Sequence, residues 1–346
     1  MTIKTDSELI DIADLDADAW NELATAQGWS DGLPMVVPTE DKVARFTSAV
    51  RADNETFAPI SPRQIVPTLK SLAANAVMAG CKPEYFPVVL AGLKAVLDPA
   101  YNLHGTLATT HPCGQLMLVS GPVRKSLDIN CGTNCLGQGR RANATIGRAL
   151  QLILLNIGGA KPGDMDRATQ GSPAKYSYCF GENEEESPFA PYHVRRGFSA
   201  NESVVTTMPA EAPHNINDHA SNSGEGLIAT IAGTMCQPGS NNVYLKGPCF
   251  VVLGPEHAQT LARDGYTAET IQEALFERSK VHISRISQEN LESWAGQGRD
   301  PIKDHYYITA TPAHINVVVA GGAGKHSVFI PSFGNTAAIA QRINLG

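Results

Sequence analysis

Cysteine and histidine side chains are concentrated between residues 104 and 135. This stretch contains His104, His111, Cys113, Cys131 and Cys135, out of seven cysteines and ten histidines in the whole chain. An even distribution would place only about one or two of them there. Thiolates and imidazoles act as nucleophiles, general bases and metal ligands. We therefore expect an enzyme whose chemistry uses a thiol, a histidine or a bound metal ion.

A glycine turn at residues 137–139 follows this stretch and leads into the apolar segment 142–157, which is a predicted helix. Helix N-termini carry a partial positive charge and unpaired N–H groups, so they bind anions. Arg140 and Arg141 flank this end, and Asn143 is a residue that could cap it. These three residues are the predicted binding site for a carboxylate or phosphate group of a substrate.

Cys81 lies in a break between two predicted helices, 64–79 and 84–97. A helix N-terminus lowers the pKa of a nearby thiol, which makes Cys81 the first candidate nucleophile. Cys113 is the second candidate, and His111 or His104 is the predicted base. The alternative for Cys81 is a small buried hydrophobic residue with no chemical role.

Cys131 and Cys135 are four positions apart, a spacing unlike that of zinc ribbons, thioredoxin-like motifs or ferredoxins. They are interpreted as loop thiols, as a redox pair, or as two ligands of a metal or iron–sulfur centre completed by Cys113 or Cys81. The choice among these alternatives stays open.

An acidic run at residues 182–186 is typical of a solvated surface. It lies close in sequence to Cys179 and His193, which leaves open a role for Glu182 and His193 as a general base or as metal ligands. A zinc or iron ion is therefore a possible cofactor.

Composition and charge exclude several functions. The formal net charge of -7 argues against nucleic-acid and anionic-membrane partners, which require a basic surface. The run Gly321–His326 lacks two residues of a phosphate loop, so no nucleotide cofactor is expected.

Residues 1–18 do not resemble a signal peptide. We expect a cytoplasmic protein with free cysteines, which assembles as a homo-oligomer.

Three apolar runs that end at glycine, 116–121, 250–254 and 315–321, are predicted strands. Helical patterns alternate with them, which indicates an α/β or α+β fold with mixed sheets covered by helices. The polar stretch 175–240 is predicted to form long loops over the active site. The expected division is an N-terminal helical arm (1–57), a first α/β domain with the Cys/His cluster (58–172) and a second α/β domain (173–346).

Four motifs resemble a bacterial protein family of largely uncharacterised function, whose members are often encoded beside UGSC-type (seleno)proteins. They are Gly28–Pro34, Asn75–Cys81, Thr110–Pro112 and Arg141–Ala149. The resemblance implies a thiol- or redox-linked enzyme for small molecules, with a small redox (seleno)protein as a possible partner.

Within this resemblance Cys81 and His111 match the family pattern, whereas the positions of Cys131 and Cys135 are not reliably cysteine. The sequence hypothesis is therefore an enzyme in which the Cys81 thiolate, assisted by His111 or His104, cleaves or reduces a carbon–heteroatom bond in a small anionic molecule. One alternative is a metal-dependent hydrolase or lyase with Cys and His ligands. Another is a non-catalytic subunit that binds a metal or a redox partner.

Overall fold

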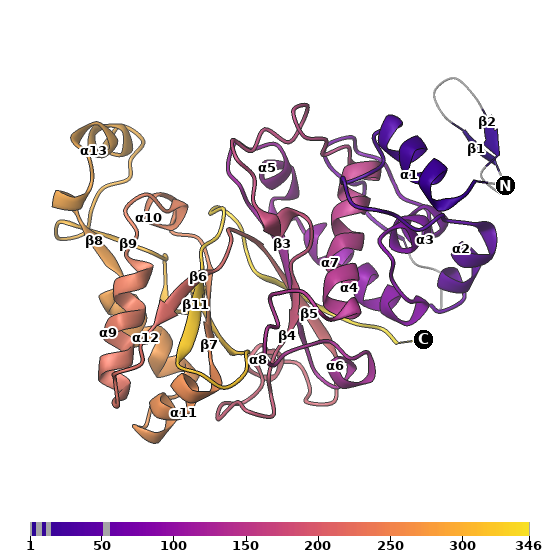
Figure 1. The fold of residues 1–346 in the computed structure, drawn as a ribbon. Coiled ribbons are helices and arrows are strands. Elements are labelled where there is room, and N and C mark those ends of the chain that lie inside the picture. Colours follow the sequence, from indigo (N-terminus) through magenta and orange to yellow (C-terminus); the bar gives the residue numbers. More distant parts are fainter. Residues whose placement is uncertain (1, 5–8, 12–14, 51–55, 346) are drawn as a thin grey trace.

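The computed structural model describes residues 2–4, 9–11, 15–50 and 56–345. Two four-stranded sheets pack face to face, and helices cover the outer face of each sheet (Figure 1). The layers are thus helices, sheet, sheet and helices. This arrangement confirms the predicted α/β architecture with mixed sheets.

The first sheet has the strand order β12-β5-β3-β4, in which β3 and β4 are parallel and the other neighbours are antiparallel. Its strands are β3 (Gly114–Ser120), β4 (Cys179–Gly181), β5 (Val204–Ala210) and β12 (Ile339–Arg342). Strands from both sides of residue 172 form this sheet. The predicted domain boundary at that residue therefore does not separate two sheets.

The second sheet has the strand order β10-β7-β11-β6, with β10 parallel to β7. Its strands are β6 (His214–Asn217), β7 (Cys249–Leu253), β10 (Ile315–Val319) and β11 (His326–Ile330). All residues of β7 and β10 are buried, because the first sheet covers one face and helices cover the other. Their continuous apolar sequences follow from this two-sided burial.

Two helices pack directly on the first sheet, α4 (Phe86–Val96) and α7 (Arg141–Ile153). α3 (Leu69–Met78) packs on α7, and α2 (Glu40–Thr47) packs on α3. Trp20 of α1 (Ala17–Ala26) and Phe46 of α2 belong to the same apolar core. The two helices of the predicted N-terminal arm are therefore part of the first helical layer.

The second helical layer consists of α9 (Gly224–Met235), α11 (Pro255–Arg263) and α12 (Ala268–Arg278). The remaining elements are short: β1 (Thr2–Lys4), β2 (Leu9–Asp11), α5 (Leu103–Leu107), α6 (Val123–Ser126), α8 (Tyr192–Arg195), α10 (Asn241–Leu245), β8 (Lys280–His282), α13 (Gln288–Ala295) and β9 (His305–Tyr307). Within the described residues, no helix combines the length and apolar character needed to cross a membrane.

The prediction of long loops over residues 175–240 is wrong. This stretch contains β4, β5, β6, α8 and α9. Three of the four residues of β6 are exposed, because β6 is the last strand of its sheet and meets solvent. Polar residues at this sheet edge resemble a loop in the sequence, although the backbone forms a strand.

Candidate functional site

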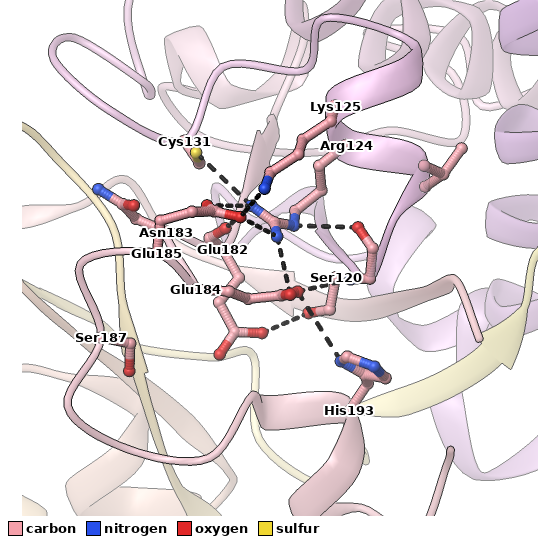
Figure 2. A network of polar contacts seen from close by, with 12 residues as sticks. Ser120, Arg124, Lys125, Cys131, Glu182, Asn183, Glu184, Glu185, Ser187 and His193 are labelled. Carbon is pink, nitrogen blue, oxygen red and sulfur yellow. Dashed lines mark hydrogen bonds and ion pairs between the residues drawn. The ribbon is translucent and has the colours of Figure 1, made fainter. Parts of the chain in front are cut away.

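A buried polar network lies where β3 and β4 end (Figure 2). Because these two strands are parallel, the residues that follow them meet at one edge of the sheet. Ser120 is the last residue of β3, and Glu182 and Glu184 follow β4. Arg124 on α6 and His193 on α8 complete the set. We call these five residues the polar network.

Glu182 is the most deeply placed carboxylate of this network, with 1% of the residue exposed. Its Oε2 accepts a hydrogen bond from the Ser120 hydroxyl (2.6 Å), and its Oε1 accepts one from the Tyr192 N–H (2.7 Å). Burial raises the pKa of Glu182 to about 7, although both hydrogen bonds oppose this rise. This carboxyl group therefore gains and loses its proton near neutral pH.

Arg124 carries a charge that is almost completely removed from water, with 3% of the residue exposed. Its Nη2 lies 2.7 Å from Glu184 Oε2, and its two terminal nitrogens lie 3.1 and 3.2 Å from the Glu185 carboxylate. Its Nη1 also donates to the backbone carbonyl of Glu182 (2.6 Å). The hydrogen bond from Arg124 is the main reason that the pKa of Glu185 is lowered to about 2.

Gly121 gives Glu184 a second fixed partner, since its N–H donates to Glu184 Oε1 (2.6 Å). Its φ of +89° lies in the left-handed region, and a Cβ at this position would come within 2.1 Å of the Glu202 carbonyl oxygen. Only glycine fits this turn between β3 and α6.

His193 is fully buried and faces the two carboxylates (Figure 2). Within the described part of the chain, neither ring nitrogen makes a hydrogen bond of ordinary geometry. Its Nδ1 lies 3.9 Å from Glu184 Oε1. Burial lowers the pKa of His193, while Glu184 and the backbone of Ala200 and Ser199 oppose the shift. The neutral imidazole that results is the form that binds metals.

Two carboxylates and one imidazole come close enough together that they could hold a metal ion. One ligand atom each from Glu182, Glu184 and His193 lies within 4.8 Å of the other two. Metal–ligand bonds of about 2.0–2.2 Å place two donors of one ion roughly 3–4 Å apart, so these side chains would have to move closer together around an ion. Two carboxylates and one imidazole suit zinc, manganese or ferrous iron. Three protein ligands would also leave a coordination position for water or a substrate.

Cys81 does not have the properties predicted for a nucleophile. It is buried, and its Sγ donates to the Thr145 carbonyl (3.2 Å). Burial raises the pKa of Cys81 to about 12, which outweighs the lowering effects of this hydrogen bond and of Arg141 and Arg148. The prediction of a lowered pKa is wrong, because removal of the thiol from water has a larger effect than nearby positive charge.

The second predicted nucleophile is not hydrogen-bonded to either of the two predicted bases among the described residues. Cys113 lies in the wall of a cavity of about 620 Å³, and burial raises its pKa to about 12. His111 instead contacts Glu211 (Nε2 to Oε1, 2.9 Å), and His104 is exposed on α5. Among the described residues, neither histidine is hydrogen-bonded to Cys81 or Cys113.

The three residues of the predicted anion site point to different partners. Arg140 reaches Asp128 at the surface (3.5 Å), while Arg141 donates to the Gly80 carbonyl (2.9 Å). Asn143 does not cap α7, because it lies inside the helix and binds both backbone groups of Asn130. Asn143 therefore anchors the preceding loop, and only Arg141 lies beside Cys81.

Cys131 and Cys135 lie on this same loop. Cys131 is half-buried with its Sγ 3.8 Å from Arg124 Nη1, while Cys135 is buried. Burial raises the pKa of both thiols, that of Cys135 to about 11. Cys179, at the start of β4, is buried and has a pKa raised to about 12. Cys131 is thus the most exposed of the seven cysteines, and the other six are buried.

The sequence interpretation included Glu182 and His193 but missed Ser120, Arg124 and Glu184. One signal is available in the structure, since Ser120 ends β3 and the acidic run directly follows β4. Polar residues at the ends of parallel strands converge at one sheet edge. However, β4 has only three residues, too few to show a strand pattern in the sequence.

Comparison of the chain with known protein-family models gives no match, and comparison with curated proteins gives none.

Thiol labelling tests the cysteine assignments. We expect iodoacetamide to modify Cys131 first in the folded protein, because it is the least buried thiol and thiolates react only when they are accessible. Cys81 and Cys113 should be modified only after unfolding. Peptide mapping by mass spectrometry measures the order. Rapid modification of Cys81 at pH 6 would show a lowered pKa and would restore the thiolate hypothesis.

The raised pKa of Glu182 predicts a pH-dependent stability. The carboxyl holds its proton up to about pH 7 in the folded state, but loses it near 4.5 when unfolded. The folded state therefore binds more protons in this interval, and the free energy of unfolding falls as pH rises through it. Between pH 5 and 8 the loss attributable to Glu182 should be about 2–3 kcal/mol in metal-free protein.

Urea unfolding of wild type and Glu182→Gln at several pH values measures this effect. Glutamine keeps the shape and cannot ionise, so the wild type should lose stability relative to the variant as pH rises. A constant difference between the two proteins over this pH range would show that Glu182 does not titrate there.

Proposed function

We propose that this protein is a metal-dependent enzyme of the hydrolase or lyase type, in which Glu182, Glu184 and His193 hold one divalent first-row transition-metal ion. The observation that carries the proposal is the cluster itself: one ligand atom each from Glu182, Glu184 and the fully buried imidazole of His193 lies within 4.8 Å of the other two. A bound cation would use the lone pair of this imidazole.

The neighbours of these ligands support the proposal. Arg124 and the Gly121 N–H hold Glu184 in place, while Ser120 and the Tyr192 N–H orient Glu182. Such outer contacts fix the direction of ligands in metal sites. A metal ion at this position would polarise a substrate oxygen or lower the pKa of a bound water.

The raised pKa of Glu182 couples metal binding to proton release. In metal-free protein, burial keeps this carboxyl group partly protonated near pH 7. It would bind a metal ion in its ionised form, so metal binding would release this proton.

The thiol mechanism predicted from the sequence has less support. Burial raises the pKa of all seven cysteine thiols. The six buried thiols are of the structural, unreactive kind, and the half-buried Cys131 also has a raised pKa. We also propose a cytoplasmic location, since seven free cysteines suit a reducing compartment.

Manganese binding tests the proposed metal site. Wild-type protein at pH 8 should bind one equivalent of Mn²⁺, measured by the EPR signal of the free ion. His193→Gln and Glu184→Gln should each weaken binding by more than the roughly 10–100-fold that loss of an outer contact costs. The matched control is His111→Gln, because His111 also contacts a glutamate but lies outside the polar network.

Catalysis is assayed separately with chromogenic esters and phosphoesters. We expect Mn²⁺ to support turnover by the wild type, but not by His193→Gln. Equal Mn²⁺ affinity of the wild type and both ligand variants would contradict the proposed site. Binding without metal-dependent turnover of any ester would contradict the hydrolase assignment.

A further inference from the structure

A separate pocket of about 380 Å³ lies between α2, the junction after α3 and the start of α7. It shares no residue with the polar network. Its polar lining includes four cationic side chains, Lys42, Arg45, Lys82 and Arg141. We call it the cationic pocket.

Positive charge exceeds negative charge among the described residues that line this pocket. Glu84 is the one carboxylate in its lining, against four cations. Within the described residues, none of the four cations lies within ion-pair distance of a carboxylate. This contrasts with Arg124 and Arg148, each of which is paired with acidic side chains. The excess positive charge is available to a bound anion.

Arg141 is positioned to bind such an anion. Its Nε donates to the Gly80 carbonyl (2.9 Å) and its Nη2 to the Cys81 carbonyl (3.4 Å). A guanidinium has five N–H groups in a rigid fork, so these two contacts fix its direction and leave further donors for a ligand. Lys42 is similarly held by the Val37 carbonyl (3.1 Å) and retains two N–H groups.

The other walls of the pocket are apolar. Val36, Phe46, Val77 and Pro83 line it beside the cations. Cys81 also lines it, but its buried thiol is hydrogen-bonded to Thr145, and its carbonyl orients Arg141. The pocket therefore combines a strongly cationic side with an apolar wall.

We propose that the cationic pocket binds a small phosphorylated organic molecule. A phosphate monoester carries close to two negative charges at neutral pH and several acceptor oxygens, which suits a surplus of cationic donors better than a single carboxylate does. The apolar wall would contact the organic part. This site is independent of the metal centre and would supply a second ligand or effector site.

Isothermal titration calorimetry with phenyl phosphate tests the site in the full-length protein. We expect one binding site per chain, and tighter binding of phenyl phosphate than of inorganic phosphate or benzoate. Arg141→Gln and Lys42→Gln should each weaken phenyl phosphate binding by about 10- to 100-fold, as expected for the loss of a charge-assisted hydrogen bond.

Arg140→Gln is the matched control, because Arg140 precedes Arg141 in the sequence but contacts Asp128 and does not line the pocket. It should leave phenyl phosphate binding unchanged. Circular dichroism of each variant shows whether the fold is retained. Equal weakening in Arg140→Gln and Arg141→Gln, tighter binding of benzoate than of phenyl phosphate, or no binding by folded wild type would each overturn the proposal.

Discussion

The buried charge of Arg124 is the constraint on which the rest of the site depends. A guanidinium removed from water is tolerated only when carboxylates and carbonyls replace its hydration. Arg124 obtains them from the segment after β4, through Glu184, Glu185 and the Glu182 carbonyl. The short strand β4 must therefore pair with β3, because that pairing carries the acidic segment to α6. The same contacts fix the direction of the Glu184 carboxylate, which lies beside His193.

Charge within the network is distributed unevenly. The positive charge of Arg124 is paired with the carboxylates of Glu184 and Glu185. The Glu182 side chain instead accepts two hydrogen bonds from neutral groups, and burial raises its pKa. His193 stays neutral because burial lowers its pKa. The network thus contains the Glu184 carboxylate held by Arg124, the Glu182 carboxyl group with a pKa near 7, and a neutral imidazole. A divalent cation would favour the ionised form of Glu182. Metal binding and proton binding at this site should therefore oppose each other.

The sequence predicted the layers better than it predicted the site. Apolar runs identified β3, β7 and β10, since strands covered on both faces have few polar residues. The sequence does not indicate the strands β4, β5, β6, β11 and β12. β4 has three residues and β6 is exposed at the sheet edge, whereas β5 is fully buried but contains two threonines and a proline. The sequence also indicates Glu182 and His193 as a candidate general base or candidate metal ligands. It did not find Arg124, because its contact with Glu184 joins residues on different elements and exists only once β3 and β4 pair. The raised pKa of Cys81 cannot be read from the sequence, because it results from burial, and burial depends on packing that spacing does not reveal.

Anomalous diffraction from crystals soaked in Zn²⁺ tests the central claim most directly. Zinc binds both oxygen–nitrogen and thiolate sites, so it can report either chemistry. We expect one strong peak about 2.0–2.2 Å from a carboxylate oxygen of Glu182, a carboxylate oxygen of Glu184 and a ring nitrogen of His193. The peak should be absent in His193→Gln crystals. Zinc bound at cysteine sulfurs instead, with no density beside His193, would contradict the account.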